Sequence, residues 1–192
     1  LDLGSGRGQN SAMLALRGKE TTLFDWSQDN LDFSQKLYEA LGKKGKFVQG
    51  DMTKPLPFAD GEFDVVFSCG VLEYFTDEQN TKILKEASRI ARKRVIILVP
   101  NAYSICYRLG MWYMQIKKQW QWGGERVFTS LMPQFYGAGF QKVEEFSVAA
   151  NHSLTFLTMP AGKTLQKIIR KIFNLTNHSN PSLLRQGYLL IS

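Results

Sequence analysis

The first eight residues place three glycines at alternate positions directly after a short apolar segment, as Leu1-Asp2-Leu3-Gly4-Ser5-Gly6-Arg7-Gly8. Glycine adopts positive φ angles easily and lets a ligand come close to the backbone. A helical pattern follows, so the N–H groups that begin this helix would face whatever the turn binds. The octet therefore predicts a strand, a turn and a helix around a nucleotide-like ligand. An NAD site would place its third glycine one residue later, where this chain has Gln9.

Strand-like and helix-like segments alternate through the first hundred residues, which is typical of a parallel sheet covered by helices. Short apolar and β-branched segments predict strands at 1–3, 21–24, 46–49, 63–67, 94–99, 143–149 and 187–192. Helical spacing of apolar residues predicts helices at 9–17, 27–41, 76–91, 128–136 and 164–174. Thr76 is the expected N-cap of the third helix. The chain begins within a strand, so we expect a truncated N-terminus.

Length and charge limit the class of protein. A chain of 192 residues fits a single domain, 1–192, with a full apolar core. No apolar run reaches the roughly 18 residues that span a membrane. Residues 1–81 carry 8 basic and 13 acidic side chains, whereas residues 82–192 carry 16 and 4. The basic half is either a solvated face or a surface for an anionic partner. Two isolated cysteines, Cys69 and Cys106, favour a cytoplasmic location.

The predicted strands end in residues that suit ligand binding. In an open parallel sheet, ligands bind at the carboxyl ends of the strands. The second strand ends at Asp25, whose carboxylate could accept hydrogen bonds from a ribose diol. The third ends at Gly50-Asp51-Met52 and the fourth at Ser68. Taken singly, Asp25 could be a helix N-terminal acid, Asp51 a turn residue and Trp26 a core residue.

Taken in order, these motifs resemble the class I S-adenosylmethionine-dependent methyltransferases, and most of all their small-molecule, type 11-like branch. The resemblance covers residues 1–100 and rests on the glycine octet, Phe24-Asp25-Trp26-Ser27, Gly50-Asp51-Met52, Leu56-Pro57-Phe58, Phe63-Asp64-Val65-Val66 and Leu72-Glu73-Tyr74. A Gly-Ala-Gly-Phe sequence at 137–140 extends it. The resemblance implies an α/β, Rossmann-like sheet of seven mostly parallel strands, with helices on both faces and the last strand antiparallel.

The resemblance also implies S-adenosyl-L-methionine as the cofactor, and a role for each matching residue. The turn formed by Gly4, Ser5, Gly6 and Gly8 would hold the methionine part, with Asp2 near its ammonium group. Asp25 would hold the ribose hydroxyls, and Trp26 would pack on the ribose and adenine side. Asp51 and the Met52 backbone would meet the adenine ring. Ser68 would contact the methionine end, and no metal is expected.

The acceptor side of the site is less constrained by the sequence. Many members of the family carry His where this chain has Tyr74, which would orient an acceptor or line the wall. Aromatic and basic residues at about 101–126, among them Tyr103, Tyr107 and Trp112, would form an acceptor-side lid with about 151–186. The amphipathic basic segment 164–174 would pack on its own domain, cover the pocket or lie on a membrane surface.

We therefore expect an enzyme that transfers a methyl group to oxygen or nitrogen of a small or medium, partly apolar acceptor. The basic half also allows an RNA methyltransferase. Against this alternative, Ser68-Cys69-Gly70-Val71 is unlike the Asn-Pro-Pro-Tyr type of motif used on exocyclic base amines. A non-catalytic S-adenosylmethionine-binding protein is a third possibility, because Tyr74 replaces the usual His. His152 and His178 lie in a connection and are expected to be bystanders.

Overall fold

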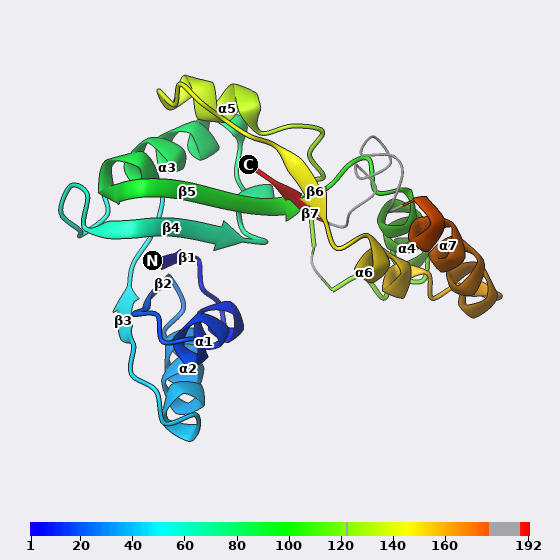
Figure 1. The fold of residues 1–192 in the computed structure, drawn as a ribbon, viewed down its shortest axis with the longest axis horizontal. Helices are drawn as coiled ribbons and strands as arrows, with labels where there is room; N and C mark the ends of the chain where they lie inside the picture. The colour runs from blue at the N-terminus through cyan, green and yellow to red at the C-terminus, as the bar shows by residue number, and fades with distance from the viewer. Residues whose placement is uncertain (122, 177–188) are drawn as a thin grey trace. The chain divides into compact units, whose positions relative to one another are not determined.

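The computed structural model describes residues 1–121, 123–176 and 189–192, and these contain one seven-stranded sheet of order β3-β2-β1-β4-β5-β7-β6 (Figure 1). The contacts divide the chain into two compact units. The first unit comprises 1–97 and 134–141, and the second comprises 98–133 and 142–192. The two predicted lid segments both fall in the second unit. That the whole chain is a single domain stays a prediction.

In the first unit, four parallel strands are interleaved with helices. The elements are β1 (Asp2–Leu3), α1 (Gln9–Leu16), β2 (Thr22–Asp25), α2 (Gln28–Ala40), β3 (Lys46–Gln49), β4 (Phe63–Cys69), a 3-10 turn η1 (Leu72–Tyr74), α3 (Asp77–Ile90) and most of β5 (Ala91–Pro100). Strand β1 pairs in parallel with both β2 and β4, and β2 pairs in parallel with β3. The carboxyl ends of these four strands therefore meet at one edge of the sheet, as the sequence predicts.

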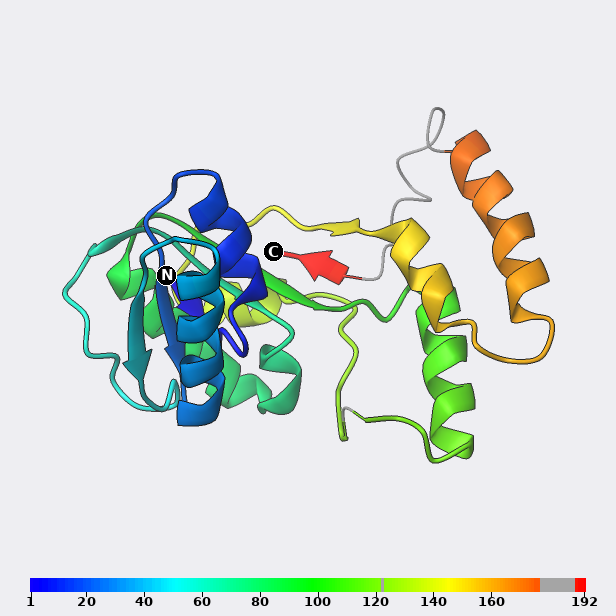
Figure 2. The same cartoon turned by 90° about the horizontal axis from the view of Figure 1, so that it is seen from below.

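Burial explains why these segments form the sheet. Leu3, Leu23, Phe24 and Val66 on neighbouring strands are almost inaccessible to solvent. Helix α3 packs Ile83, Ala87 and Ile90 into one cluster with Leu3, Phe24 and Val66. Leu23 belongs to a second cluster, with Ala12 and Ala15 of α1 and Leu31 and Tyr38 of α2. Thr76 caps α3 as predicted, in a reciprocal pair of bonds with Gln79. Figure 2 shows α1 and α2 together beside β1 and β2.

The second unit combines the end of the sheet with a group of helices. Its elements are α4 (Ile105–Ile116), β6 (Phe146–Val148), α6 (Ala150–Ser153), a 3-10 turn η2 (Leu154–Phe156), α7 (Gly162–Thr176) and β7 (Leu189–Ile191); α5 (Met132–Gly137) begins in it. Strand β7 pairs antiparallel with Leu98–Pro100 of β5 and with β6. The antiparallel last strand is therefore confirmed. Residues Trp122 and His178 lie outside the described residues.

Two segments differ from the sequence prediction. Residues 105–116 form helix α4, which the alternating pattern does not predict. The predicted helix 128–136 begins only at Met132, because Phe128 forms a bridge with Asn101 and its N–H donates to the carbonyl of Pro100. Among the described residues, no helix is long and apolar enough to cross a bilayer.

Candidate functional site

The glycine turn lies against the ends of the neighbouring strands. The N–H groups of Gly4 and Ser5 donate to the carbonyl of Phe24, at 2.8 and 3.1 Å. A Cβ on Gly4 would lie 2.8 Å from Val71 and 2.9 Å from Met52, so only glycine fits there. At Gly6, by contrast, a Cβ would meet no described atom within 4 Å beyond the chain neighbours. The turn is therefore packed tightly on its protein side and open at its tip.

Asp25 is buried at the end of β2 and holds this turn in place. Its Oδ2 accepts a hydrogen bond from the Gly6 N–H at 2.7 Å. Its Oδ1 accepts from the Ser27 N–H at 2.9 Å and from the Asn30 side chain at 3.3 Å. Ser34, one turn further along α2, donates to the Gly6 carbonyl. Asp25 is thus both the N-terminal acid of the helix and the anchor of the glycine turn.

Trp26 follows Asp25 and projects into solvent. Trp26 is 78% exposed, so it is not part of the core, as a residue of its size often is. Its carbonyl accepts a hydrogen bond from Gln49 at 3.1 Å, which ties it to the end of β3. A tryptophan exposed to this degree leaves a ring face available for a flat ligand.

Asp51 and Met52 follow β3 and differ in environment. Asp51 is exposed, and its Oδ1 accepts from both the N–H and the hydroxyl of Thr53. These hydrogen bonds lower the pKa of the Asp51 carboxyl, so it stays ionised. The Met52 side chain is buried in the main core cluster and approaches Gly4. The Met52 side chain therefore packs in the protein interior, and the role of its backbone toward a ligand stays a prediction.

Asp2 is only 2% exposed, and this burial raises the pKa of its carboxyl to about 6, against the lowering effect of a hydrogen bond from Ser11. The Ser11 hydroxyl lies 2.7 Å from Asp2 Oδ2. Burial is also the main cause of the raised pKa of the Cys69 thiol, followed by the negative charges of Asp2 and Glu73. Among the described residues, no Lys or Arg forms an ion pair with Asp2 or Asp25.

Two serine hydroxyls complete the edge of the sheet. Ser5 Oγ, in the glycine turn, and Ser68 Oγ, in β4, are enclosed and have no hydrogen-bond partner among the described residues. Buried hydroxyls usually have a partner, so each marks a place where a ligand atom would fit. The exposed Tyr74 follows the buried Glu73 in η1.

The structure also identifies residues near the site that the sequence prediction omitted. Ser11, Asn30 and Ser34 bond to predicted site residues, and Glu73 is a buried acid beside Gly70. The positions of Asn30 and Ser34, one helical turn apart in α2, are the sequence signal that could have found them. Arg7, in the glycine turn, stacks on Phe33 of α2, with its Cζ atom 4.9 Å from the centre of the ring.

The predicted acceptor-side residues lie in the second unit and differ among themselves. Tyr103 and Trp112 are exposed. Tyr107 is fully buried, packs against Trp120 and Phe156, and donates a hydrogen bond to Glu125. Because no part of Tyr107 reaches the surface, this structure does not support a role for it in lining a pocket. Its aromatic neighbours make it part of the core of the second unit.

The sequence-family model described as "Methyltransferase domain" matches residues 1–99, slightly more than half of the chain. This chain belongs to the class I S-adenosylmethionine-dependent methyltransferases. Among curated relatives, the biotin biosynthesis bifunctional protein BioHC of Cellvibrio japonicus is 30% identical over 63% of this chain and 22% of the relative. YqeM of Bacillus subtilis is 34% identical over 51% of this chain and 40% of that protein. The chain thus spans well under half the length of the curated relatives it matches.

Solved structures confirm the methyltransferase fold. An S-adenosylmethionine-dependent methyltransferase of Thermotoga maritima aligns with a TM-score of 0.62 at 18% identity, over 99% of this chain and 77% of that one. Magnesium protoporphyrin IX methyltransferase of Synechocystis, solved with bound S-adenosylhomocysteine, aligns with a TM-score of 0.59 at 19% identity, over 75% and 64% of the two chains. At this identity the likeness concerns the fold alone.

The residues present fit the cofactor of this family, S-adenosylmethionine. The cofactor carries an ammonium group, a sulfonium, a ribose diol and a flat adenine. The carboxylates Asp2 and Asp25 have no cation bound to them among the described residues, and Trp26 offers an exposed ring. The Ser5 and Ser68 hydroxyls lack partners in the described structure, and the glycine turn is open at Gly6. Within residues 1–121, 123–176 and 189–192, no cluster of three metal-type ligands occurs.

Proposed function

We propose that this chain binds S-adenosylmethionine at the edge formed by β1 to β4 and transfers its methyl group to oxygen or nitrogen of a small or medium, partly apolar acceptor. The observation that carries the proposal is that two buried carboxylates, two buried hydroxyls and an exposed tryptophan meet at the ends of parallel strands, and that these hydroxyls have no hydrogen-bond partner among the described residues. Such a set suits a cationic ligand that also carries a diol and a flat base.

The cofactor, when bound, supplies a methyl group on a positively charged sulfur that leaves as a neutral thioether. The protein then has to place the acceptor in line with that methyl group, and placement alone lowers the barrier substantially. In the proposed arrangement Asp2 accepts from the ammonium group and Asp25 accepts from the ribose diol. Asp51 and the Met52 backbone hold the adenine, while Trp26 packs on its side. Ser5 and Ser68 bind the methionine end.

Tyr74 is the proposed acceptor-side residue of the first unit. It is about half exposed at the end of η1, next to the strand end that carries Ser68. A general base is needed only if the acceptor must lose a proton before it attacks. Because Tyr74 stands where many relatives carry His, we propose that it orients the acceptor hydroxyl or amine. Tyr103 and Trp112 remain proposed acceptor contacts. A cytoplasmic location also remains a proposal, and it rests on Cys69 and Cys106, which form no disulfide bond.

Calorimetry tests the cofactor site. We expect S-adenosylmethionine and S-adenosylhomocysteine to bind and NAD not to bind. Asp25→Ala should weaken binding more than tenfold, corresponding to about 1.5–3 kcal/mol for charge-assisted hydrogen bonds to the ribose. Asp29→Ala is the matched control, because Asp29 is an exposed acid in the first turn of the same helix. Equal affinity of the two variants would refute the ribose role of Asp25.

Labelled cofactor tests the acceptor class. The protein is incubated with methyl-labelled S-adenosylmethionine and, separately, with a small-molecule extract, total RNA or a lipid extract. Label in the small-molecule fraction, reduced in Tyr74→Ala and largely kept in Tyr136→Ala, is the expected result. Tyr136 is a matched control because it is exposed to a similar degree but lies in α5. Selective labelling of RNA would instead support the RNA methyltransferase alternative.

A further inference from the structure

The helices of the second unit combine exposed apolar side chains with a basic surface. On α4, Leu109, Trp112 and Ile116 recur at the helical spacing of three and four residues. Trp112 is 56% and Ile116 is 58% exposed, while the opposite side of the helix buries Cys106, Tyr107 and Gly110. Among the described residues, α4 thus has one apolar side that packs in the core of its unit and one that is exposed. We call the exposed residues Leu109, Trp112 and Ile116 the outer stripe of α4.

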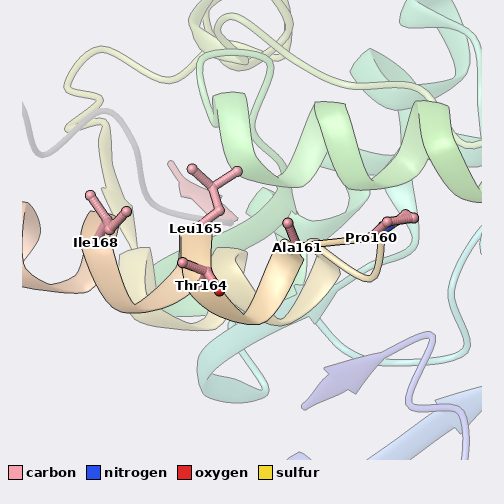
Figure 3. A pocket seen from close by; sticks show the side chains of 5 residues that line it. All are labelled: Pro160, Ala161, Thr164, Leu165 and Ile168. Carbon is pink, nitrogen blue, oxygen red and sulfur yellow. The ribbon is translucent and has the colours of Figure 1, made fainter.

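Helix α7 repeats this arrangement. Leu165 and Ile169 pack against Cys106, Leu154 and Leu157, which agrees with the expectation that the helix packs on its own domain. Ile168, which precedes Ile169 and lies at the edge of the same apolar face, is 53% exposed. Figure 3 shows Leu165 and Ile168 on one side of α7, beside Pro160 and Ala161. Together with Thr164 these residues line a shallow hollow of about 290 Å³, whose walls are almost entirely apolar.

The opposite side of α7 carries four basic residues. Lys163, Lys167, Arg170 and Lys171 are all exposed, and they fall opposite the apolar face at helical spacing. No acidic residue occurs after Glu145 in the sequence. Between residues 101 and 126 the only acid is Glu125, which accepts the hydrogen bond from Tyr107. Glu125 is therefore the only side-chain carboxylate that residues 101–126 and 146–192 of the sequence contain.

We propose that α4 and α7 form a docking surface for an anionic lipid bilayer. A surface that lies in the membrane interface combines side chains such as Trp, Ile or Leu with side chains of Lys and Arg. Here the outer stripe of α4 and Ile168 supply the exposed apolar side chains and the lysines and arginine of α7 supply the charge, while Leu165 and Ile169 stay packed in the unit. Tryptophan is favoured at that depth because its ring is amphipathic. Each Lys or Arg near the surface adds attraction to anionic headgroups.

Charge and side-chain type disfavour two other occupants. A two-fold symmetric dimer formed through this surface would bring one basic surface against another. Single-stranded RNA would neutralise the charge, but it is bound through aromatic stacking, and of the four exposed side chains Leu109, Trp112, Ile116 and Ile168 only Trp112 offers a ring for a base. An anionic bilayer, by contrast, can neutralise the basic side chains and also take up the exposed apolar ones. This inference concerns the second unit and does not depend on the proposed methyl transfer.

Vesicle sedimentation of the whole chain tests the proposal. We expect binding to vesicles of equal parts phosphatidylcholine and phosphatidylglycerol, and at least about tenfold weaker binding to phosphatidylcholine alone. The triple variant Lys167→Glu, Arg170→Glu, Lys171→Glu should lose at least about tenfold in binding to the mixed vesicles. The matched control is Lys19→Glu, Lys44→Glu, Lys85→Glu, which makes the same charge change at exposed positions of the first unit. An equal loss of vesicle binding in both triple variants would overturn the assignment of the docking surface to α4 and α7.

A second pair of variants tests insertion rather than charge. Trp112→Ser with Ile168→Ser should weaken binding to the mixed vesicles, whereas Tyr136→Ser with Leu16→Ser, which alters equally exposed residues elsewhere, should not. Lipids with brominated acyl chains should quench tryptophan fluorescence, and Trp112→Phe should remove most of this quenching while binding persists. Circular dichroism checks that the variants fold. The proposal is overturned by equal binding to neutral and anionic vesicles, by binding to neither, or by self-association that buries Trp112.

Discussion

The two units of this molecule use polar and apolar residues in opposite ways. At the strand ends of the first unit, polar groups are buried and bonded to one another, as in the contacts of Asp25 with Gly6 and of Asp2 with Ser11. On the helices of the second unit, apolar side chains such as Trp112 and Ile168 are exposed beside lysines and arginines. Burying polar groups costs free energy, and so does exposing apolar groups. Each arrangement therefore marks a surface that a binding partner would complete.

The largest expected effect is at the glycine turn. Gly8 has a φ of +74°, and a Cβ there would lie 2.7 Å from Leu23 and from Ser34 Oγ. We expect Gly8→Ala to lower the free energy of unfolding by about 2–5 kcal/mol, through backbone strain and overpacking. Gly6→Ala should cost only about 1–2 kcal/mol, because its Cβ would enter open space. Urea denaturation measures both, and equal losses would show that the packing at Gly8 is unimportant.

The next effect concerns the buried Asp2. Its pKa is raised by burial to about 6 from the ordinary value of 3.8, so the folded protein binds more protons than the unfolded chain between these two pH values. Its contribution to stability is therefore fully present below pH 4 and is lost as the pH rises to 6, by up to about 3 kcal/mol. Asp2→Asn should remove this loss and be more stable than the wild type at pH 7.

The same substitution should weaken cofactor binding, since a neutral amide attracts an ammonium group less than a carboxylate does. Denaturation between pH 4 and pH 7, together with calorimetry at pH 7, measures the two effects. An Asp2→Asn variant that gains no stability and binds the cofactor as well as the wild type would show that Asp2 plays neither role. Asp29→Asn, which changes an exposed acid, should alter neither property.

A smaller effect is expected in the interior of the second unit. The Tyr107 hydroxyl donates to Glu125, and burial raises the pKa of the Glu125 carboxyl. Tyr107→Phe keeps the ring packing and removes this bond, so we expect a loss of about 1–3 kcal/mol. Tyr113→Phe, on the same helix but partly exposed, should be close to neutral. If Tyr107→Phe were also neutral, the core of the second unit would not depend on this bond.

The smallest effect is expected on the outer stripe of α4. Trp112→Ser and Ile116→Ser should change the free energy of unfolding by no more than about 0.5 kcal/mol, because both side chains are more than half exposed. Thermal denaturation measures this. A loss of several kcal/mol from either substitution would mean that the stripe packs within the protein, and the contrast between the two units would then disappear.

How much of the fold and of the candidate site could be predicted from the sequence depended on how far apart the interacting residues lie along the chain. The strand ends that carry Asp25, Asp51 and Ser68 follow from local patterns, because strand and turn signals lie within a few residues of each. Helix α4 was missed, since exposed apolar residues on its outer stripe hide the amphipathic period. The burial of Tyr107 depends on Phe156, and the bond from Gly6 to Asp25 spans 19 residues. Contacts of this kind are set by tertiary packing rather than by sequence pattern.

The pairing of β7 has a consequence for the order in which the protein can be completed. Leu98–Pro100 and β6 both pair with residues 189–191, and they are separated in the sequence from these residues by about ninety and about forty positions. While the chain is being made on a ribosome, this part of the sheet cannot close until residues 189–191 emerge. The strands β1 to β4 need no residue beyond β4 for their own pairing. The edge of the sheet that carries Asp25 and Ser68 can therefore assemble first, and a nascent chain halted before residue 189 would leave strand edges open to aggregation.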